Sequence, residues 1–213
     1  MKLFKLSKEI QFPAHHYADK NDGILAYGGD LSSERLIFAY KNGIFPWFNE
    51  DEPIIWHSPK KRFVLFPNEL KVSKSMRKII NSNEFNVTEN IDFEQVINKC
   101  GNINRANQVG TWITNEMKSA YLKLHHLGFA KSIEVWKEKE LVGGFYGIDL
   151  GDIFCGESMF SKVSNASKAG FIHFVNKYNT NYKLIDCQVY TDHLASLGAK
   201  EIPRDEFLKY LSL

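Results

Sequence analysis

Asp186 and Gln188 lie two residues apart in the strand-like run 183–190, and a carboxylate beside a carboxamide could orient and polarise a reacting group. The run has the composition of a β-strand, in which successive side chains point to opposite faces. This alternation predicts one face with Ile185, Cys187 and Val189 in the core, and an opposite face with Leu184, Asp186, Gln188 and Tyr190. Two residues along a strand separate Cα atoms by about 7 Å, so the side chains of Asp186 and Gln188 could meet. A solvent-facing edge strand can carry the same pair, so the pair alone leaves both interpretations open.

Cys187, His193 and Asp186 offer another constellation, in which an imidazole activates a thiol. The strand alternation argues against it, because Cys187 should point into the core and away from Asp186. The three cysteines are odd in number and lack C-x-x-C spacing, so we expect Cys100, Cys155 and Cys187 to be reduced and buried. The histidines also lack the spacing of metal ligands, and no metal site is predicted.

Glu157 lies in the strand-like stretch FCGESMF. Regular alternation predicts one face with Phe154, Gly156, Ser158 and Phe160, and the other with Cys155, Glu157 and Met159. A glutamate beside a cysteine and a methionine is costly to bury unpaired. We therefore expect its carboxylate to reach water or to meet a cation.

Three glycines, Gly143, Gly144 and Gly147, lie within a strand pattern and lack the Lys-Ser/Thr pair of a phosphate-binding loop. Bulges or close backbone packing explain them better than a nucleotide site. A Gly-rich pyrophosphate loop is also missing before the predicted helix near Ser164, where an enzyme that uses acyl-CoA would need one.

Basic residues gather between Lys60 and Lys78, where seven Lys and Arg side chains accompany a single acid, Glu69. Several of them share a predicted helix with the apolar residues Val72, Met76, Ile79 and Ile80. Such a charged face is usually only solvated, but charges of one sign without acidic partners also suit phosphate binding. Both interpretations stay open.

The chain of 213 residues is long enough for one large domain, or for an ordinary domain and a small one. Its hydrophobic fraction of 44% and charged fraction of 24% are those of a soluble globular protein, and its formal net charge is +2. No apolar run approaches the roughly 20 residues of a membrane helix, and the N-terminus lacks the apolar segment of a signal peptide. We therefore expect a cytoplasmic protein that does not bind membranes.

The elements that must position these residues divide at the proline-rich stretch near residue 60. Residues 1–62 are expected to form a small N-terminal domain of loops and one helix, with a start at Asp30 or Ser32 and a stop at Gly43. Residues 63–213 are expected to form a larger domain. In it, helices precede an antiparallel meander of strands at 131–136, 140–148 and 153–160, and a helix and a strand at 183–190 follow. This order predicts an α+β fold with a sheet covered by helices.

Seven stretches of the chain together form a recognisable signature. They are, in order, GILAYGGDLSSERLIFAYKNGIFPWF, SPKKR, TWIT, AYLKLHHLGFAKSIEVW, LVGGFYGIDLGDIFCGESMFS, NASK and LIDCQVYTDHLASLGAKEIPR. Over nearly the whole chain, this signature resembles the bacterial leucyl/phenylalanyl-tRNA–protein transferases. The resemblance implies a catalytic domain similar to the GCN5-related N-acetyltransferase (GNAT) fold, with a mainly antiparallel sheet flanked by helices, behind a small N-terminal domain.

The same resemblance implies an activity. The enzyme would move leucine or phenylalanine, with methionine as a further candidate, from Leu-tRNA or Phe-tRNA to the N-terminal Arg or Lys of a protein. The added residue would mark that protein for N-degron degradation. The resemblance implies no cofactor, which agrees with the missing pyrophosphate loop, and we expect a monomer.

The resemblance also implies roles for individual residues. Asp186 and Gln188 would form the catalytic relay, and Glu157 would be the acid that faces the acceptor peptide. The aminoacyl pocket is implied at Met159, Phe154 and Phe174, contacts to the donor's terminal adenosine at Trp47 and Trp112, and the tRNA-binding helix at Lys74, Arg77 and Lys78.

Two positions depart from the family's pattern. His57 stands where relatives commonly have Trp, and Phe145 stands where a close relative has Met. We expect Phe145 to line the substrate pocket and to change its shape, which bears on the choice between leucine and phenylalanine.

An aminoacyl ester is already activated, so amide formation needs a neutral amine held against the ester carbonyl. Positioning can supply roughly 7–11 kcal/mol, whereas a general base typically gives about 10²–10⁴-fold in rate, so alignment should dominate. A glutamine amide is too weak a base to hold a proton. We therefore expect Gln188 to orient the amine and Asp186 to polarise Gln188. A non-catalytic tRNA-binding module and a small-molecule N-acyltransferase are the alternative functions.

Overall fold

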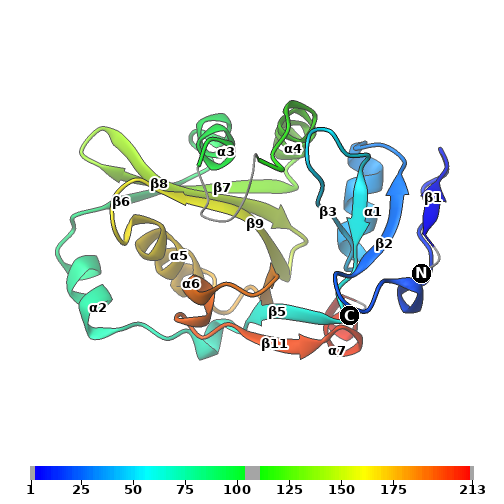
Figure 1. Cartoon of the computed structure of the whole chain (residues 1–213). Coiled ribbons are helices and arrows are strands. Elements are labelled where there is room, and N and C mark those ends of the chain that lie inside the picture. Colours follow the sequence, from blue (N-terminus) through cyan, green and yellow to red (C-terminus); the bar gives the residue numbers. More distant parts are fainter. Residues whose placement is uncertain (1–2, 104–110, 212–213) are drawn as a thin grey trace.

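The computed structural model describes residues 3–103 and 111–211. Its main sheet contains β5 (Lys61–Leu65), β6 (Asn86–Glu89), β7 (Ala130–Lys137), β8 (Glu140–Asp149), β9 (Ile153–Ser161), β10 (Leu184–Gln188) and β11 (Lys200–Pro203). The strand order is β11-β5-β10-β9-β8-β7-β6 (Figure 1). Neighbouring strands are antiparallel, except that β9 and β10 are parallel.

Strands β7, β8 and β9 are the predicted meander, and β8 pairs with both of its neighbours along almost its whole length. The parallel pair β9 and β10 requires a crossover, and α5 (Ala166–Lys177) supplies most of it. The α+β class, with a mainly antiparallel sheet flanked by helices, is therefore confirmed.

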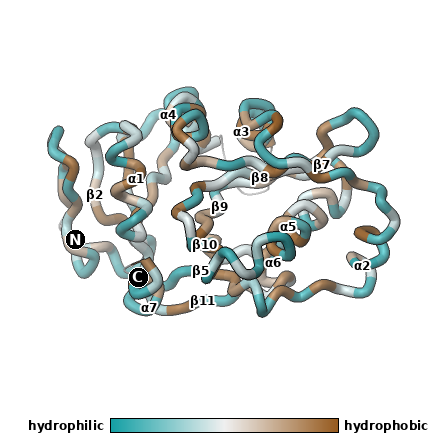
Figure 2. The backbone as a smooth tube through the Cα atoms, turned by 180° about the vertical axis from the view of Figure 1, so that it is seen from behind, coloured by the Kyte–Doolittle hydropathy of each residue, from teal (hydrophilic) through white to brown (hydrophobic). Residues whose placement is uncertain are grey.

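Helices cover both faces of this sheet (Figure 1). On one face lie α3 (Phe93–Gly101) and α4 (Asn115–His126), and on the other lies α5 with α2 (Lys74–Asn81) against it. Figure 2 shows hydrophilic and hydrophobic segments on both α3 and α4, as expected of helices with one buried side. Two short helices, α6 (Asp192–Ala195) and α7 (Arg204–Leu211), follow β10 and β11.

The sheet separates the two larger of the three hydrophobic cores found among the described residues. The first core lies between the sheet and α3 and α4, and it includes Phe93, Tyr121, Tyr146 and Leu184. The second core lies between the sheet and α5, and it includes Phe145, Phe154, Phe174 and Ile185.

The first sixty residues contain more structure than the predicted loops and one helix, so that prediction was wrong in part. The helix is present as α1 (Ser33–Lys41), and the Ser32 side chain caps it by accepting the Arg35 backbone N–H. A second sheet has the order β1-β2-β4-β3, formed by β1 (Phe4–Leu6), β2 (Ile24–Gly28), β3 (Phe45–Pro46) and β4 (Ile55–His57). These strands have two to five residues, which is too short for their alternation to be distinctive.

Short 3-10 turns at His15–Tyr17 and Pro67–Glu69 complete the described elements. The four-stranded sheet ends at His57 and the seven-stranded sheet begins at Lys61. However, Tyr40 of α1 belongs to the first core, together with residues of α3 and α4. The division into domains at 1–62 and 63–213 stays a prediction.

The glycines of β8 meet their neighbours at close range, as predicted. A β-carbon at Gly147 would lie 2.3 Å from the carbonyl oxygen of Cys155, and one at Gly144 would lie 2.6 Å from the carbonyl oxygen of Ile133. Only a residue without a side chain fits at either position. Among the described residues, no helix combines the length and the apolar character needed to span a membrane.

We predict that Gly147→Ala lowers the free energy of unfolding by about 1–3 kcal/mol, because the new methyl group collides with backbone and with the Phe154 ring. Urea denaturation measures this change. Gly156→Ala is the matched control, because Gly156 pairs with Gly147 but a β-carbon there would be 3.7 Å from its nearest neighbour, the Asp186 carbonyl oxygen. Equal losses in the two variants would contradict the steric explanation.

Candidate active site

Asp186 forms a buried ion pair with Arg62 of β5. The Arg62 Nε and Nη2 atoms donate to the two carboxylate oxygens at 2.7 Å and 2.6 Å, and the exposures of the two residues are 2% and 0%. Burial acts to lower the pKa of Arg62, but the charge and hydrogen bonds of Asp186 raise it above its usual range. The predicted contact between the side chains of Asp186 and Gln188 is therefore replaced by a two-pronged ion pair.

Asp186 nevertheless holds Gln188, through the backbone. Its Oδ1 atom accepts the Gln188 backbone N–H at 2.9 Å. The pairing of β10 with β5 shifts register between Asp186 and Gln188, which leaves Cys187 in a bulge. Gln188 has a φ of 62°, in the left-handed region that residues other than glycine seldom occupy. The bulge and this backbone angle end the simple alternation on which the shared face was predicted.

Glu157 also lies in a bulge. The pairing of β8 with β9 shifts between Tyr146 and Gly147, and Glu157 is the unpaired residue of β9. The bulge reverses the alternation beyond it, so Phe154 and Phe160, predicted to share a face, belong to different cores. The prediction that Cys155 and Met159 share a face is wrong for the same reason.

The Glu157 carboxylate meets three polar side chains rather than a cation. Gln188 Nε2 donates to Oε1 at 2.7 Å, and the Tyr121 hydroxyl donates to Oε2 at 3.0 Å. The Tyr40 hydroxyl is hydrogen-bonded to that of Tyr121. Burial raises the pKa of Glu157 to about 7, although hydrogen bonds from Tyr40, Tyr121 and Gln188 act to lower it and the charge of Asp186 acts to raise it. Glu157 therefore changes charge near neutral pH.

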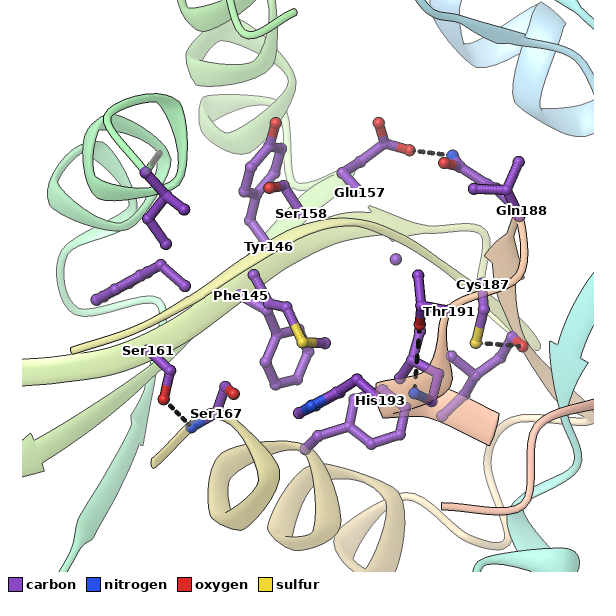
Figure 3. A pocket seen from close by; sticks show the side chains of 18 of the residues that line it. Phe145, Tyr146, Glu157, Ser158, Ser161, Ser167, Cys187, Gln188, Thr191 and His193 are labelled. Atoms are coloured by element: carbon purple, nitrogen blue, oxygen red, sulfur yellow. Dashed lines mark hydrogen bonds between the residues drawn. The ribbon is translucent and has the colours of Figure 1, made fainter. Parts of the chain in front are cut away.

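A cavity of about 490 Å³ opens where β9 and β10 part, because their pairing ends at Cys155 and Asp186. Figure 3 shows Glu157 and Gln188 meeting on one side of the strands, and Phe145 and His193 on the side of α5. The cavity thus joins a polar end, where chemistry can occur, to an apolar end.

The predicted pocket residues lie at two depths. Phe145 and Met159 line the apolar end, together with Phe171 of α5. Phe154 and Phe174 do not line the cavity: both have 0% exposure and lie behind Phe145, at ring-centroid distances of 6.2 Å and 5.5 Å. They can shape the pocket only by holding Phe145.

Trp47 and Trp112 both line the cavity. Trp47 is 42% exposed, and its ring lies 5.6 Å from that of His57, measured between centroids. The two ring nitrogens of His57 are hydrogen-bonded to the backbone carbonyls of Asp22 and Trp47. Trp112 is 9% exposed. The structure thus brings the two tryptophans to the same cavity as Gln188 and Glu157.

The structure offers no support for a thiol nucleophile at Cys187. Burial and the charge of Asp186 raise the pKa of Cys187, and its thiol donates to the carbonyl of Ile185 at 3.8 Å. All three cysteines are free and buried, as predicted. Within residues 3–103 and 111–211, no group of three His, Cys, Asp or Glu side chains could hold a metal ion.

The basic run 60–78 splits in the structure. Arg62 is buried against Asp186, and Lys61 pairs with Glu201 at 2.7 Å, so these two do not belong to a free basic surface. Lys74, Arg77 and Lys78 are exposed on α2, and none of them has an ion pair among the described residues. This helix lies apart from the cavity, on the far side of α5 (Figure 1).

Three residues of the site are absent from the sequence prediction. Arg62 was counted as surface charge, although its companion Asp186 was a candidate catalytic acid. Tyr40 and Tyr121 come from α1 and α4, and their helical patterns show only that they are buried. The contact between them depends on how distant segments pack, which no local pattern reports.

Comparison with known proteins gives consistent results. A family model for leucyl/phenylalanyl-tRNA protein transferase matches residues 64–212, and the model of its N-terminal domain matches residues 29–60. A leucyl/phenylalanyl-tRNA–protein transferase of Flavobacterium psychrophilum is 58% identical, over 97% of this chain and 98% of that protein. The protein of the same name from Pectobacterium carotovorum is 51% identical, over 100% of this chain and 91% of the other.

Solved structures match at lower similarity. FemX has a TM-score of 0.48 and 9% identity, over 80% of this chain and 66% of that chain. A GCN5-related N-acetyltransferase-like protein from Streptococcus suis has a TM-score of 0.39 and 11% identity, over 80% of this chain and 64% of that chain.

We predict that Asp186→Asn lowers the free energy of unfolding by about 3–5 kcal/mol, because it leaves the buried Arg62 charge without a carboxylate. Chemical denaturation measures the loss. Asp152→Asn is the control, because its ion pair with Lys183 is exposed and should contribute less than about 1 kcal/mol. A loss at Asp186 no larger than at Asp152 would show that the buried pair does not support the fold.

Proposed function

Because the chain belongs to the leucyl/phenylalanyl-tRNA–protein transferase family, we propose that it moves leucine or phenylalanine from tRNA to the N-terminal arginine or lysine of a protein. Family membership makes the chain an aminoacyltransferase whose substrates are an aminoacyl-tRNA and a protein. The observation that carries the acceptor proposal is the pair of Gln188 and Glu157 in the cavity wall. A carboxylate there suits an acceptor with a positive charge.

The reaction needs alignment more than activation. The ester of the donor is already reactive, and a free α-amino group has a pKa of about 7.7–8.0, so an appreciable fraction is neutral near neutral pH. Holding the amine against the ester carbonyl can supply roughly 7–11 kcal/mol. A rigid site at the meeting point of the two substrates is therefore the main requirement.

Gln188 is proposed to orient the attacking amine. Its Nε2 is engaged by Glu157, so its carboxamide oxygen is the atom that can accept an N–H of the amine. Asp186 fixes the Gln188 backbone, and Arg62 fixes Asp186. Asp186 thus acts on the reaction as a positioning residue, through Gln188.

The apolar end of the cavity is proposed to hold the side chain of the donor amino acid. Phe145 and Met159 offer it an apolar surface, on which each buried methylene contributes about 0.8 kcal/mol. Phe154 and Phe174 support this surface from behind. Trp47 and Trp112, on the same cavity, are proposed to contact the terminal adenosine of the tRNA.

Three further features belong to this proposal. The acceptor is marked for degradation, the reaction takes place in the cytoplasm, where aminoacyl-tRNA is made, and the enzyme acts as a monomer. The exposed residues Lys74, Arg77 and Lys78 of α2 are proposed to contact tRNA phosphates, because charges without ion-pair partners are available to a polyanion.

The deciding experiment incubates the protein with radiolabelled leucyl-tRNA and matched peptides that begin with arginine or citrulline. Label should enter the arginine peptide, and the citrulline peptide should be a poorer acceptor, because it lacks the charge that Glu157 attracts. Glu157→Gln should remove most of this preference. Release of leucine without label in any peptide would overturn the proposal, and would favour a tRNA-binding module or an acyltransferase for small molecules.

We further predict that replacing Lys74, Arg77 and Lys78 together by Gln weakens tRNA binding, and reduces the slope of log K against log salt concentration by about 2–3. Filter binding over a salt series measures both. The matched control replaces Lys137, Lys162 and Lys183, which carry the same charge but are paired with carboxylates. An identical slope in the two triple variants would exclude α2 as the tRNA contact.

A further inference from the structure

We infer that Glu157 takes the proton from the attacking amine, and that Tyr40 and Tyr121 are positioning residues that hold its carboxylate ready to do so. This inference rests on the proposed function and adds a proton acceptor to it. It also assigns a task to two tyrosines that the alignment of the substrates does not use.

The geometry is a chain of hydrogen bonds that crosses the site. It runs from Tyr40 on α1 to Tyr121 on α4, from Tyr121 to Glu157 on β9, and from Glu157 to Gln188 on β10. Each carboxylate oxygen thus has a fixed donor, Tyr40 adds a further hydrogen-bonding contribution, and a carboxylate can accept about four hydrogen bonds. Glu157 therefore keeps acceptor capacity for the substrate, and its two fixed contacts set its direction.

Glu157 can accept the proton of the amine, whereas its neighbour Gln188 cannot. A glutamine amide is too weak a base to hold a proton. Gln188 can therefore orient the amine but cannot accept the proton that the amine releases. An effective base titrates near the pH at which it works, and the burial of Glu157 brings its pKa to about 7. Glu157 lines the cavity next to Gln188, the residue proposed to orient the amine.

The step balances without an added reagent. The lone pair of the amino nitrogen attacks the ester carbonyl carbon, and a C–N bond forms. Glu157 takes one proton from the nitrogen, which has become positively charged. The bond between that carbon and the ribose oxygen breaks, and Glu157 returns the proton to this oxygen. An amide and a free tRNA hydroxyl result, and Glu157 is again a carboxylate.

The tyrosines act as neutral donors throughout. Burial, and then the charge of Glu157, raise the pKa of both Tyr40 and Tyr121 well above the usual range, so neither hydroxyl loses its proton near pH 7. The other charged or titratable groups that face Glu157 or its two tyrosines are Arg62 on β5, Tyr146 on β8, Cys155 on β9 and Asp186 on β10. The Asp186 charge acts to raise the pKa of Glu157, whereas the two tyrosines act to lower it.

The first test compares the wild type with Glu157→Gln at saturating leucyl-tRNA and peptide. The inference requires kcat to fall by about 10²–10⁴-fold, for the citrulline peptide as well as for the arginine peptide. A role limited to attracting positive charge would raise KM for the arginine peptide only and leave kcat unchanged. That second result would overturn the inference while the proposed function stands.

The second test uses Tyr121→Phe, which removes the direct donor to Glu157 but keeps the ring. Because that hydrogen bond lowers the pKa of Glu157, its loss should raise this pKa. Glu157 acts in its deprotonated form, so the acidic limb of kcat against pH should move to higher pH. The amine of the peptide titrates identically with either enzyme, so the shift reports the enzyme alone.

Tyr182→Phe is the matched control, since Tyr182 is a buried tyrosine of the second core. The acidic limb of kcat against pH should be the same for Tyr182→Phe as for the wild type. Tyr40→Phe should move the limb in the same direction as Tyr121→Phe, because the hydrogen bonding of Tyr40 also acts to lower the pKa of Glu157. An unmoved limb in Tyr121→Phe, with normal melting and normal KM values, would overturn the inference. Failure of the wild type to label any peptide would instead overturn the proposed function.

Discussion

A buried guanidinium and a buried carboxylate are each stable only when they are paired, and the pairing of Arg62 with Asp186 fixes the geometry of the site. Arg62 also donates to the carbonyl of Gly43 at 3.3 Å, and its guanidinium lies between the rings of Phe45 and Phe207, at 4.6 Å and 4.7 Å from their centroids. One side chain thus joins the end of α1, strand β3, helix α7 and strand β10. Loss of either charge would leave the other buried without a partner, which is far more costly than loss of an exposed pair.

Two irregularities in the sheet shape the candidate site on this rigid support. A regular β9 and a regular β10 would each send alternate side chains to opposite cores. The bulges at Glu157 and Cys187 interrupt that order, and the parting of the two strands opens a space between them. Glu157 and Gln188 can therefore meet at 2.7 Å, although they come from strands whose pairing has already ended. The left-handed backbone of Gln188 is a local strain that the surrounding contacts sustain.

The parts of the fold that the sequence predicts are those with long, regular patterns. The meander is foreseen because its strands have eight to ten residues, and over that length a strand pattern leaves little ambiguity. The strand that carries Asp186 has only five residues, and its composition rather than its length predicts it. The strands of the N-terminal sheet are too short to show any period. Within the site, the expected contact between the side chains of Asp186 and Gln188 is wrong, and the contact between Glu157 and Gln188 is not foreseen, because a one-residue bulge reverses every face beyond it. Arg62 is misread as surface charge, since a local charge count cannot reveal a partner 124 residues away.

The contact between Tyr40 and Tyr121 bears on how this protein can be divided. Tyr40 belongs to α1, within the stretch matched by the N-terminal family model, whereas Glu157 and Gln188 belong to the stretch matched by the other. The electrostatic environment of the central carboxylate is therefore assembled from both segments of the polypeptide. A fragment that contains only the seven-stranded sheet and its helices would keep every proposed substrate-contacting group except Trp47. It would lack Tyr40, however, and the electrostatic environment of Glu157 would change. The amino-terminal segment thus contributes directly to the proposed acid–base group, through Tyr40.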